Sequence, residues 1–349
     1  MMTKWKRLLV AGGLMLTVAL QLTGCGQSNQ AAAPAKQEVL KPEVVNIGFQ
    51  DIPNDEIVAK VKGFYESELG VKVNFKKFDS GRDVNNAFAS NSIDIGLMGS
   101  TPAAVGIAKG LGYEVFWIHD LIGAAESLAV KNTANINEVK DLKGKKVAVP
   151  FSSTAHYSLL NALKVEGVNP AEVKILDMQP PDIFAAWQRG DIDAAYVWNP
   201  VLGKLLADGK VITDSGKLAE KGIITADIGV VSKEFARKYP EVVANYIQVQ
   251  QKAHDLYKNN PDEAAAALAK GLNIDKAEAL KQTRELIWLS AREQVTDKYF
   301  GASTKKGNLA NVLKATADFL VEQKAIETAP ALEVFEKAVN PQYIENTLK

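Results

Sequence analysis

Two stretches of the sequence place hydroxyl side chains where a helix is predicted to begin. Ser100 and Thr101 precede Pro102, a residue type favoured at the first position of a helix, and Ser153 and Thr154 open a second predicted helix. The start of a helix attracts anions through its free N–H groups and the positive end of its dipole. Either pair alone is explained by ordinary capping, but the two together favour an anion-binding site.

Two carboxylates stand in apolar surroundings. Glu126 precedes the run Ser127 to Val130, and Asp227 precedes the run Ile228 to Val231. A buried carboxylate is costly unless it is paired, and a cationic ligand group would pair it. Pairing with a protein Lys, Arg or backbone N–H remains an equal alternative.

Aromatic residues near the end of the strand predicted at 192–197 could stack on a ligand ammonium. Trp198 lies just past the strand and before Asn199, which makes it the better candidate for the site. Trp187 has helical spacing with Ile183 and Phe184, which favours packing in the core.

The sequence offers little for catalysis. It has three histidines, His119, His156 and His254, and no cluster with metal-ligand spacing, phosphate-binding glycine loop or nucleophile elbow. We therefore expect no enzyme, no cofactor and no metal site.

The N-terminus has the pattern of an export signal. Lys4, Lys6 and Arg7 precede the apolar run Leu8 to Leu22, which is too short for a permanent span. The run ends before Cys25, the only cysteine, in a segment that resembles the bacterial lipoprotein lipobox. We expect Cys25 to carry lipid, so no disulfide is possible.

The remaining composition points to an exported globular protein. Residues 26–42 are rich in Gln, Ala, Ser and Pro, which predicts a flexible tether. Loss of the three basic residues of the signal would leave 38 Lys and Arg against 41 Asp and Glu. This mild negative charge favours neither nucleic acid nor an anionic membrane surface as a partner.

Strands and helices alternate along the first two thirds of the chain. We expect strands at residues 44–49, 71–75 and 93–98 with helices near 55–69 and 83–89, and again strands at 145–149, 173–177 and 192–197 with helices near 154–166 and 182–188. This alternation predicts largely parallel sheets in an α/β fold, with the ligand crevice beyond the carboxyl ends of the strands.

A weak internal repeat suggests one copy for each of two lobes. The segment Ser92 to Gly96, followed by Pro102, is similar to Asp191 to Ala195, followed by Pro200. Strand-like segments at residues 126–130 and 227–231 would cross between the lobes and form a hinge. Residues after Ser232 should be nearly all helical, with helices at 240–258, 261–270, 275–288, 308–323 and 330–338. We expect these helices to pack on lobe one, and one of them also to reach lobe two.

These observations divide the chain. We expect residues 1–24 to be a lipoprotein signal peptide, 25–42 a lipid-anchored tether, 43–128 the first part of lobe one, 129–225 lobe two, and 226–349 the return to lobe one with the C-terminal helices.

Three longer motifs carry a resemblance to a known family. They are residues 77–81 (KFDSG), 149–160 (VPFSSTAHYSLL) and 179–198 (QPPDIFAAWQRGDIDAAYVW). The chain from about Val44 to Phe235 resembles the taurine-binding proteins of bacterial ABC importers. The resemblance implies a type II periplasmic-binding-protein fold whose two lobes close on one small ligand.

The resemblance also implies roles for individual residues. It places the sulfonate on Ser100, Thr101, Ser153 and Thr154 with His156 or Tyr157 nearby, the amine at Glu126 and Asp227, and Gln50 in the lining of the pocket. Two features depart from the family: the segment Asp51 to Asp55, and Gly229, where the family often has a tryptophan. The missing indole would widen the amine end.

The function implied is that of an extracytoplasmic, lipid-anchored monomer. It would deliver taurine to an ABC permease and, through it, to the ATPase. Another aliphatic sulfonate is the alternative ligand. An enzyme of the same fold is the alternative class, although a desulfinase with a cysteine nucleophile is excluded if Cys25 carries lipid.

Overall fold

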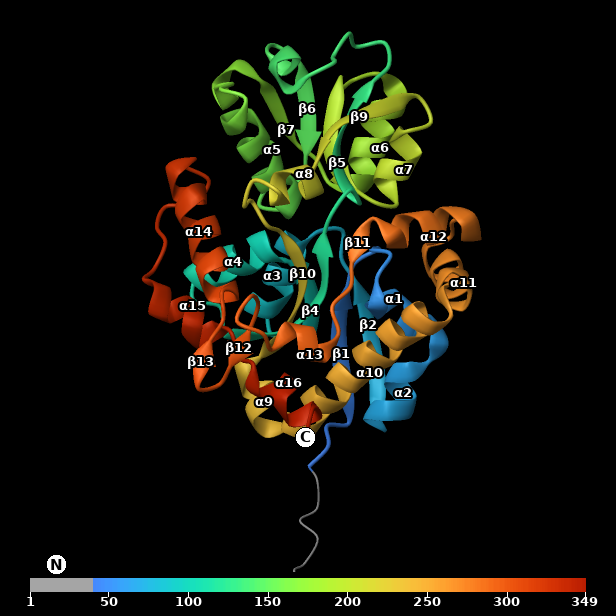
Figure 1. Cartoon of the computed structure of the whole chain (residues 1–349), viewed down its shortest axis with the longest axis vertical. Coiled ribbons are helices and arrows are strands. Elements are labelled where there is room, and N and C mark those ends of the chain that lie inside the picture. Colours follow the sequence, from blue (N-terminus) through green and yellow to red (C-terminus); the bar gives the residue numbers. More distant parts are fainter. Residues whose placement is uncertain (1–39) are drawn as a thin grey trace, which may run out of the picture. The chain divides into compact units, whose positions relative to one another are not determined.

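The β-branched and aromatic runs of the sequence form the strands of two separate sheets (Figure 1). The structure, a computed structural model, describes residues 40–349. The expected signal segment, Cys25 and all of the tether before Leu40 lie outside the described residues.

Lobe one is built on a sheet of six strands in the order β11-β4-β10-β3-β1-β2. Its strands are β1 (Val44–Phe49), β2 (Lys72–Lys77), β3 (Ile95–Gly99), β4 (Tyr113–Ile122), β10 (Ala226–Ser232) and β11 (Leu286–Ile287). β1 pairs in parallel with β2 and β3, whereas β10 is antiparallel to both β3 and β4.

Lobe two is built on a sheet of five strands in the order β7-β6-β8-β5-β9. Its strands are β5 (Glu126–Lys131), β6 (Lys146–Val149), β7 (Lys174–Asp177), β8 (Ala194–Trp198) and β9 (Gly209–Asp214). β6 pairs in parallel with β7 and β8, and β5 is antiparallel to β8 and β9.

The two strand orders match, which confirms the internal repeat. Leaving out β11, the order β4-β10-β3-β1-β2 corresponds position by position to β9-β5-β8-β6-β7. β10 and β5, the strands that follow the two crossings, therefore hold equivalent places. Because each arrives from the other lobe and runs antiparallel to its neighbours, both sheets are mixed and not largely parallel as predicted.

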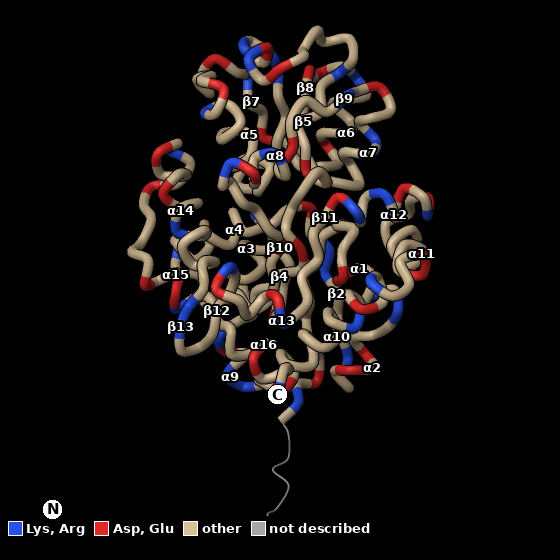
Figure 2. Tube along the Cα trace, viewed as in Figure 1, with Lys and Arg blue, Asp and Glu red and all other residues tan. Residues whose placement is uncertain are grey.

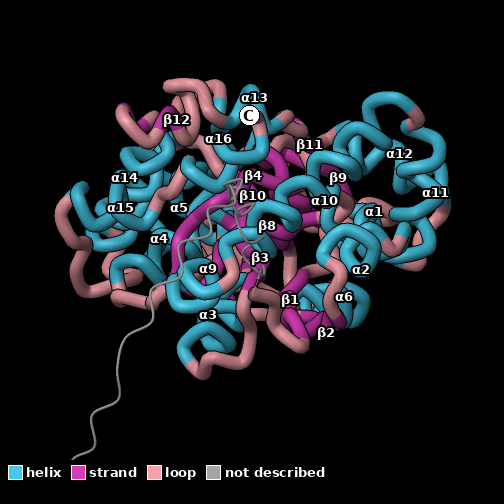
Figure 3. Tube along the Cα trace, turned by 90° about the horizontal axis from the view of Figure 1, so that it is seen from below, coloured by secondary structure: helices cyan, strands magenta, loops and turns pink. Residues whose placement is uncertain are grey.

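Helices cover the sheets on both faces. In Figure 3, α4, α14 and α15 lie on one side of the lobe-one sheet and α1, α10 and α11 on the other. The helices up to β10 are α1 (Asp55–Lys62), α2 (Phe64–Leu69), α3 (Gly81–Ala89), α4 (Ser100–Ala108), α5 (Thr154–Val165), α6 (Pro180–Arg189), α7 (Val201–Leu205) and α8 (Ser215–Ala219), with 3-10 turns at Val139–Leu142 and Pro170–Glu172.

The chain after β10 is mainly helical, as predicted. Its elements are α9 (Lys233–Lys238), α10 (Pro240–Asn259), α11 (Pro261–Leu272), α12 (Lys276–Arg284), α13 (Ala291–Gln294), α14 (Leu309–Glu322), α15 (Leu332–Ala338) and α16 (Gln342–Thr347), with a small hairpin of β12 (Gly301–Ala302) and β13 (Lys305–Lys306). Within residues 40–349, no helix combines the length and apolar character required to cross a bilayer.

Two predicted helices differ from the structure at identifiable residues. The helix expected at residues 55–69 is two helices, because Gly63 lies between them in the left-handed conformation, with φ of 68°. The helix expected to end at Trp288 ends at Arg284, because Leu286 and Ile287 pair with the edge of β4 as β11.

One C-terminal helix also contacts lobe two. Phe319 of α14 meets Tyr157 of α5 edge to face at 5.2 Å between ring centroids, and Glu322 lies 2.9 Å from the Nζ of Lys164. α14 itself packs on α4 of lobe one. The helix therefore joins both lobes on one side of the molecule.

Candidate functional site

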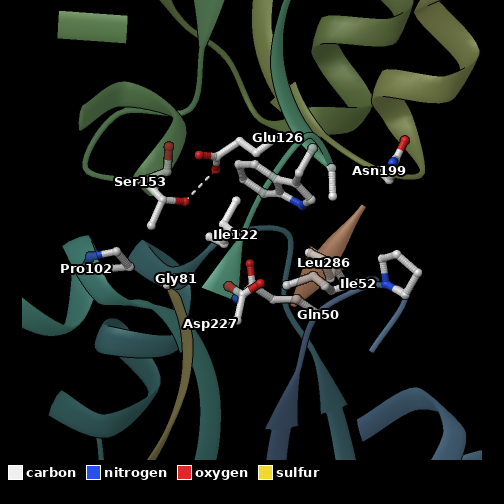
Figure 4. A pocket seen from close by; sticks show the side chains of 15 residues that line it. Gln50, Ile52, Gly81, Pro102, Ile122, Glu126, Ser153, Asn199, Asp227 and Leu286 are labelled. Carbon is white, nitrogen blue, oxygen red and sulfur yellow. Dashed lines mark hydrogen bonds between the residues drawn. The ribbon is translucent and has the colours of Figure 1, made fainter. Parts of the chain in front are cut away.

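A pocket lies between the lobes, where the strands of both sheets end (Figure 4). Its volume is about 430 Å³ when the space open to solvent is included. Six of the ten predicted ligand-binding residues line it: Gln50, Glu126, Ser153, Thr154, Trp198 and Asp227. These residues are far apart in the sequence and come from both lobes.

The charge of the pocket is negative. Its lining includes the carboxylates of Glu126 and Asp227, and no Lys or Arg is among the described residues that line it. The Lys and Arg residues are spread over both lobes, as Figure 2 shows. In a site of low dielectric, this arrangement favours a positive group on the ligand.

Asp227 lies on β10 in the floor of the pocket and is 6% exposed. Its register partner on β4 is Asp120, which is fully buried. Burial, together with the charges of Asp120 and Glu126, raises the pKa of Asp227 well above its ordinary value. The sequence reasoning missed Asp120, because only the pairing of β4 with β10 brings the two carboxylates together.

Glu126 is the first residue of β5, and its carboxylate accepts hydrogen bonds from three hydroxyl groups of lobe two. Thr154 and Ser215 donate hydrogen bonds to its carboxylate at 2.5 and 2.7 Å, and Ser158 donates at 3.4 Å. Burial raises the pKa of Glu126 to about 7, although these hydrogen bonds act in the opposite direction. Hydroxyl groups were not among the partners that we expected for Glu126 from the sequence.

The predicted anion-binding hydroxyls mostly have protein partners. Ser100 accepts from the N–H of Ala226, and Ser153 both caps α5 by accepting from the N–H of His156 and donates to a backbone carbonyl. Thr101 is the exception, because its buried Oγ1 has no partner among the described residues.

The first turn of α4 therefore differs from the first turn of α5. It has no side-chain cap, whereas α5 is capped by Ser153. Gly99 and Pro102 at the start of α4 line the pocket. The first N–H groups of α4 are therefore left without a side-chain acceptor, which is the condition under which a helix start attracts an anion.

His156 and Tyr157 are not among the pocket-lining residues. The ring of His156 stacks on Phe151 at 4.5 Å, and burial lowers its pKa to about 4. Tyr157 faces Phe319 of α14. His156 faces the loop before α5, where its Nδ1 accepts a 3.4 Å hydrogen bond from the N–H of Ser152.

Neutral side chains complete the pocket. Gln50 is held by a 3.2 Å hydrogen bond from its Nε2 to the carbonyl of Leu97. Trp198 packs on an apolar cluster that includes Ile52 and Leu286, both of which line the pocket. Ile52 and Leu286 carried no functional signal in the sequence.

Gly229 does not line the pocket. A Cβ placed there would lie 3.2 Å from the Cβ of Trp117, 3.3 Å from the ring of Phe116 and 3.4 Å from Nε2 of His119. A side chain at this position would crowd these three residues and point among them, not into the pocket lining. The expectation that Gly229 widens the amine end is therefore wrong.

Polar contacts join the lobes around the pocket. Arg82 of α3 lies 2.7 Å from Asp177 of lobe two, and Asn199 of lobe two donates to Glu285 at the end of α12 at 2.7 Å. Asp83 accepts a hydrogen bond from Gln179 at 3.0 Å. These contacts form only when the lobes are close together.

Within residues 40–349, no group of His, Cys, Asp and Glu side chains is arranged to hold a metal ion. The described lining of the pocket contains no Cys, Lys or His. Its side chains with acid–base or nucleophilic chemistry are the carboxylates of Glu126 and Asp227 and the hydroxyls of Ser153 and Thr154.

Comparison with known proteins is consistent with this geometry. Residues 55–264 match the family model described as NMT1/THI5 like. The chain is 39% identical to the taurine-binding periplasmic protein of Escherichia coli over 80% of this chain and 86% of that one. It is 29% identical to a putative aliphatic sulfonates-binding protein of Bacillus subtilis over 90% and 91% of the two chains.

Solved structures show the same fold. The alkanesulfonate-binding protein SsuA of Xanthomonas axonopodis superposes with a TM-score of 0.72 at 21% identity, covering 86% of this chain and 99% of that one. The desulfurization enzyme DSZB superposes with a TM-score of 0.62 at 16% identity, covering 88% and 99%. These likenesses identify the fold as that of type II periplasmic binding proteins, which confirms the predicted fold class.

Proposed function

Because this chain belongs to the NMT1/THI5-like family, we propose that it is the extracytoplasmic solute-binding protein of a bacterial ABC importer and that its ligand is taurine. The relative at 39% identity is named for taurine binding and the relative at 29% for aliphatic sulfonates. A small zwitterion also suits a closed pocket between two lobes.

The observation that carries this proposal is the position of two features in one pocket. The carboxylate of Asp227 lies in the floor, and the uncapped first turn of α4 opens at the wall through Gly99 and Pro102. An ammonium placed at Asp227 and a sulfonate placed at the N–H groups of α4 would satisfy both. Glu126, with its hydroxyl partners, would lie on the opposite wall.

We propose that the ten candidate residues serve the ligand site in different ways. Asp227, Glu126, Gln50 and Trp198 would contact the ligand directly. Ser100, Thr101, Ser153 and Thr154 would shape the helix starts, whereas His156 and Tyr157 would support α5 from outside the pocket.

An aliphatic sulfonate without an amine is the second candidate ligand, favoured by the relative from Bacillus subtilis. A thermal-shift series with taurine, longer alkanesulfonates, sulfate, nitrate and glycine betaine separates the candidates. A ligand at 100 times its dissociation constant should stabilise the protein by about 2.7 kcal/mol. A larger shift with a longer alkanesulfonate than with taurine would contradict the taurine proposal.

An enzyme of the same fold is the alternative of a different class. The fold is shared with DSZB, but the only cysteine of this chain is Cys25, and the described pocket lining contains no cysteine. Release of sulfite or ammonia from a sulfonate by the purified protein would overturn the binding-protein proposal.

The cellular arrangement follows from the N-terminal pattern. We propose that residues 1–24 are a lipoprotein signal, that Cys25 carries the lipid and that residues 25–42 tether the folded part to the membrane. The folded part would be a monomer of two lobes. The boundary expected after residue 128 moves to 125, because β5 pairs in the lobe-two sheet from Glu126 onward; lobe one would comprise residues 43–125 with 226–349, and lobe two residues 126–225. The protein would deliver its ligand to a permease and, through it, to an ATPase, without a cofactor or nucleic acid.

A further inference from the structure

Asp120 is a buried carboxylate that is only partly hydrogen-bonded. One of its oxygens accepts a 3.0 Å hydrogen bond from the side-chain amide of Asn54. The other, Oδ1, is buried and no N–H or hydroxyl donor of the described residues reaches it; the carboxyl of Asp227 is its neighbour, and the two can share a hydrogen bond when one of them is protonated. Asp120 itself is 0% exposed.

The pairing of β4 and β10 determines where this oxygen lies. Asp120 and Asp227 are register partners in an antiparallel pair, so their side chains project from the same face of the sheet. Asp227 lines the pocket. Asp120 does not itself line the pocket. It is the next carboxylate behind Asp227 on the same face of the sheet, and its charge acts on the amine end of the pocket through Asp227.

Two adjacent buried carboxylates cannot both stay ionised without positive charge beside them. Among the described residues, the pocket lining supplies no Lys or Arg. His119 of β4 is the nearest basic side chain; its Nδ1 lies 2.6 Å from Asp55 of α1, and its charge when protonated lowers the pKa of Asp227 without offsetting the effect of burial and of Asp120. The protein thus leaves a negative site that needs either a proton or a ligand cation.

We propose that Asp120 is a specificity-determining residue that forms, together with Asp227, a two-carboxylate site for the positively charged nitrogen of the ligand. This inference rests on the proposed function, since it assigns the amine end of the zwitterion. An ammonium has three N–H donors and can satisfy more than one carboxylate at once. The site would then select ligands mainly by their compact ammonium group, and the sulfonate group would contribute less to the affinity.

A proton competes with the ligand for this site. Burial raises the pKa of Asp120 to about 8, and burial with the charge of Asp120 raises that of Asp227. The other titratable groups around the pair are Glu126 on β5, Asp55 and Glu56 on α1, and His119 on β4. Binding of an ammonium should therefore release a proton near pH 7.

Isothermal titration calorimetry of the full chain with taurine, ethylammonium and ethanesulfonate tests the inference. Asp120→Asn keeps the shape and should weaken taurine and ethylammonium at least about tenfold while changing ethanesulfonate little. The matched control is Glu114→Gln, which removes a carboxylate from the other end of β4 that is held by Asn340 and Tyr343. The control should bind all three ligands as the wild type does.

Proton release provides a readout that a purely structural role would not change. Titrations of taurine into the wild type in two buffers of different ionisation enthalpy should show release of a fraction of a proton at pH 7, and Asp120→Asn should reduce it. Because it needs only the wild type, this measurement still tests the two-carboxylate site if Asp120→Asn does not fold. Absence of proton exchange in the wild type would overturn the two-carboxylate site.

The outcomes separate the two proposals. Taurine binding that is insensitive to Asp120→Asn overturns the role of Asp120 and leaves the proposed function intact. Binding of ethylammonium but not taurine, lost in Asp120→Asn, overturns the function and supports the cation site. No binding of either amine to the wild type overturns both.

Discussion

Glu126 and Asp227 lie at equivalent positions in the two halves of the fold. Each stands at the start of the strand that follows a crossing between the lobes, and these strands, β5 and β10, occupy the same place in matching strand orders. Their surroundings differ, because Glu126 receives three hydroxyl donors whereas Asp227 faces a second carboxylate. The two residues should therefore not contribute equally to ligand binding.

Asp227→Asn should weaken taurine binding more than Glu126→Gln does. A charge-assisted hydrogen bond to an ammonium contributes about 1.5 to 3 kcal/mol, so the loss at Asp227 should be about tenfold or more. Glu126 already has partners, and its loss should be smaller. Calorimetric titration measures both.

Ethanesulfonate is the control ligand for this pair, since it lacks the amine. It should lose little affinity in Asp227→Asn. Equal losses of taurine and ethanesulfonate would mean that Asp227 maintains the contact between the lobes instead of binding the amine.

The contact of Arg82 with Asp177 should favour the closed arrangement modestly. The two side chains are 35% and 37% exposed, and exposed ion pairs contribute about 0.2 to 1 kcal/mol. Arg82→Gln should therefore weaken ligand binding by no more than about fivefold. Lys62→Gln, which removes an ion pair of similar exposure within lobe one, should leave the affinity unchanged. Equal effects of the two variants would show that Arg82 has no role in closure.

The order of strands and helices was predictable because it depends on local patterns. Alternating β-branched runs and helical periods indicated two similar lobes, and Asp227 and Glu126 were visible as charges in apolar runs. Glycine disfavours a helix interior, so Gly63 indicated a break that our prediction of one helix at 55–69 did not include. Its φ of 68° shows why glycine is needed there.

What the sequence could not show depends on contacts between distant segments. Asp120 joins the site only through the register of β4 against β10, and Leu286 only because it adds a short strand to the edge of β4. His156 and Tyr157 follow Ser153 and Thr154 in the motif, yet the turn of α5 points them to Phe151 and Phe319. Adjacency in sequence did not mean adjacency in the pocket.

Gly229→Ala should destabilise the protein by about 1 to 3 kcal/mol, since an added Cβ would crowd Trp117 and Phe116 in a packed interior. Urea denaturation measures the change. Gly112→Ala is the matched control, because nothing lies within 4 Å of a Cβ there, and it should change stability by less than about 0.5 kcal/mol. Unchanged stability of Gly229→Ala would mean that the space beside β10 is open after all.

Cys25→Ala should separate anchoring from ligand binding. The variant should be released from the membrane or remain unprocessed, because the lipid acceptor is gone, while the purified folded part keeps its ligand affinity. Fractionation of cells and the mass of the protein report the first effect, and titration reports the second. A membrane-bound variant of the mature wild-type size would contradict the lipoprotein proposal.

Stability without ligand should fall as the pH rises from about 5.5 to 8.5. Burial raises the pKa values of Glu56 and Glu126 to about 7 and that of Asp120 to about 8, all above the values of the unfolded chain. The folded state therefore holds more protons than the unfolded state in this window, and its stability is lost as these groups ionise. Urea denaturation at each pH should show a decrease of at least about 1 kcal/mol.

Asp120→Asn should flatten this pH dependence, because one of the three groups no longer titrates. Glu172→Gln is the control, since hydrogen bonding by Lys143 and the N–H of Asn169 lowers the pKa of Glu172, which is then ionised in both states across the window. Saturating taurine should also reduce the loss of stability at high pH, because its ammonium replaces the proton. A variant of Asp120 with the full slope of the wild type would show that this carboxylate titrates normally in the folded protein.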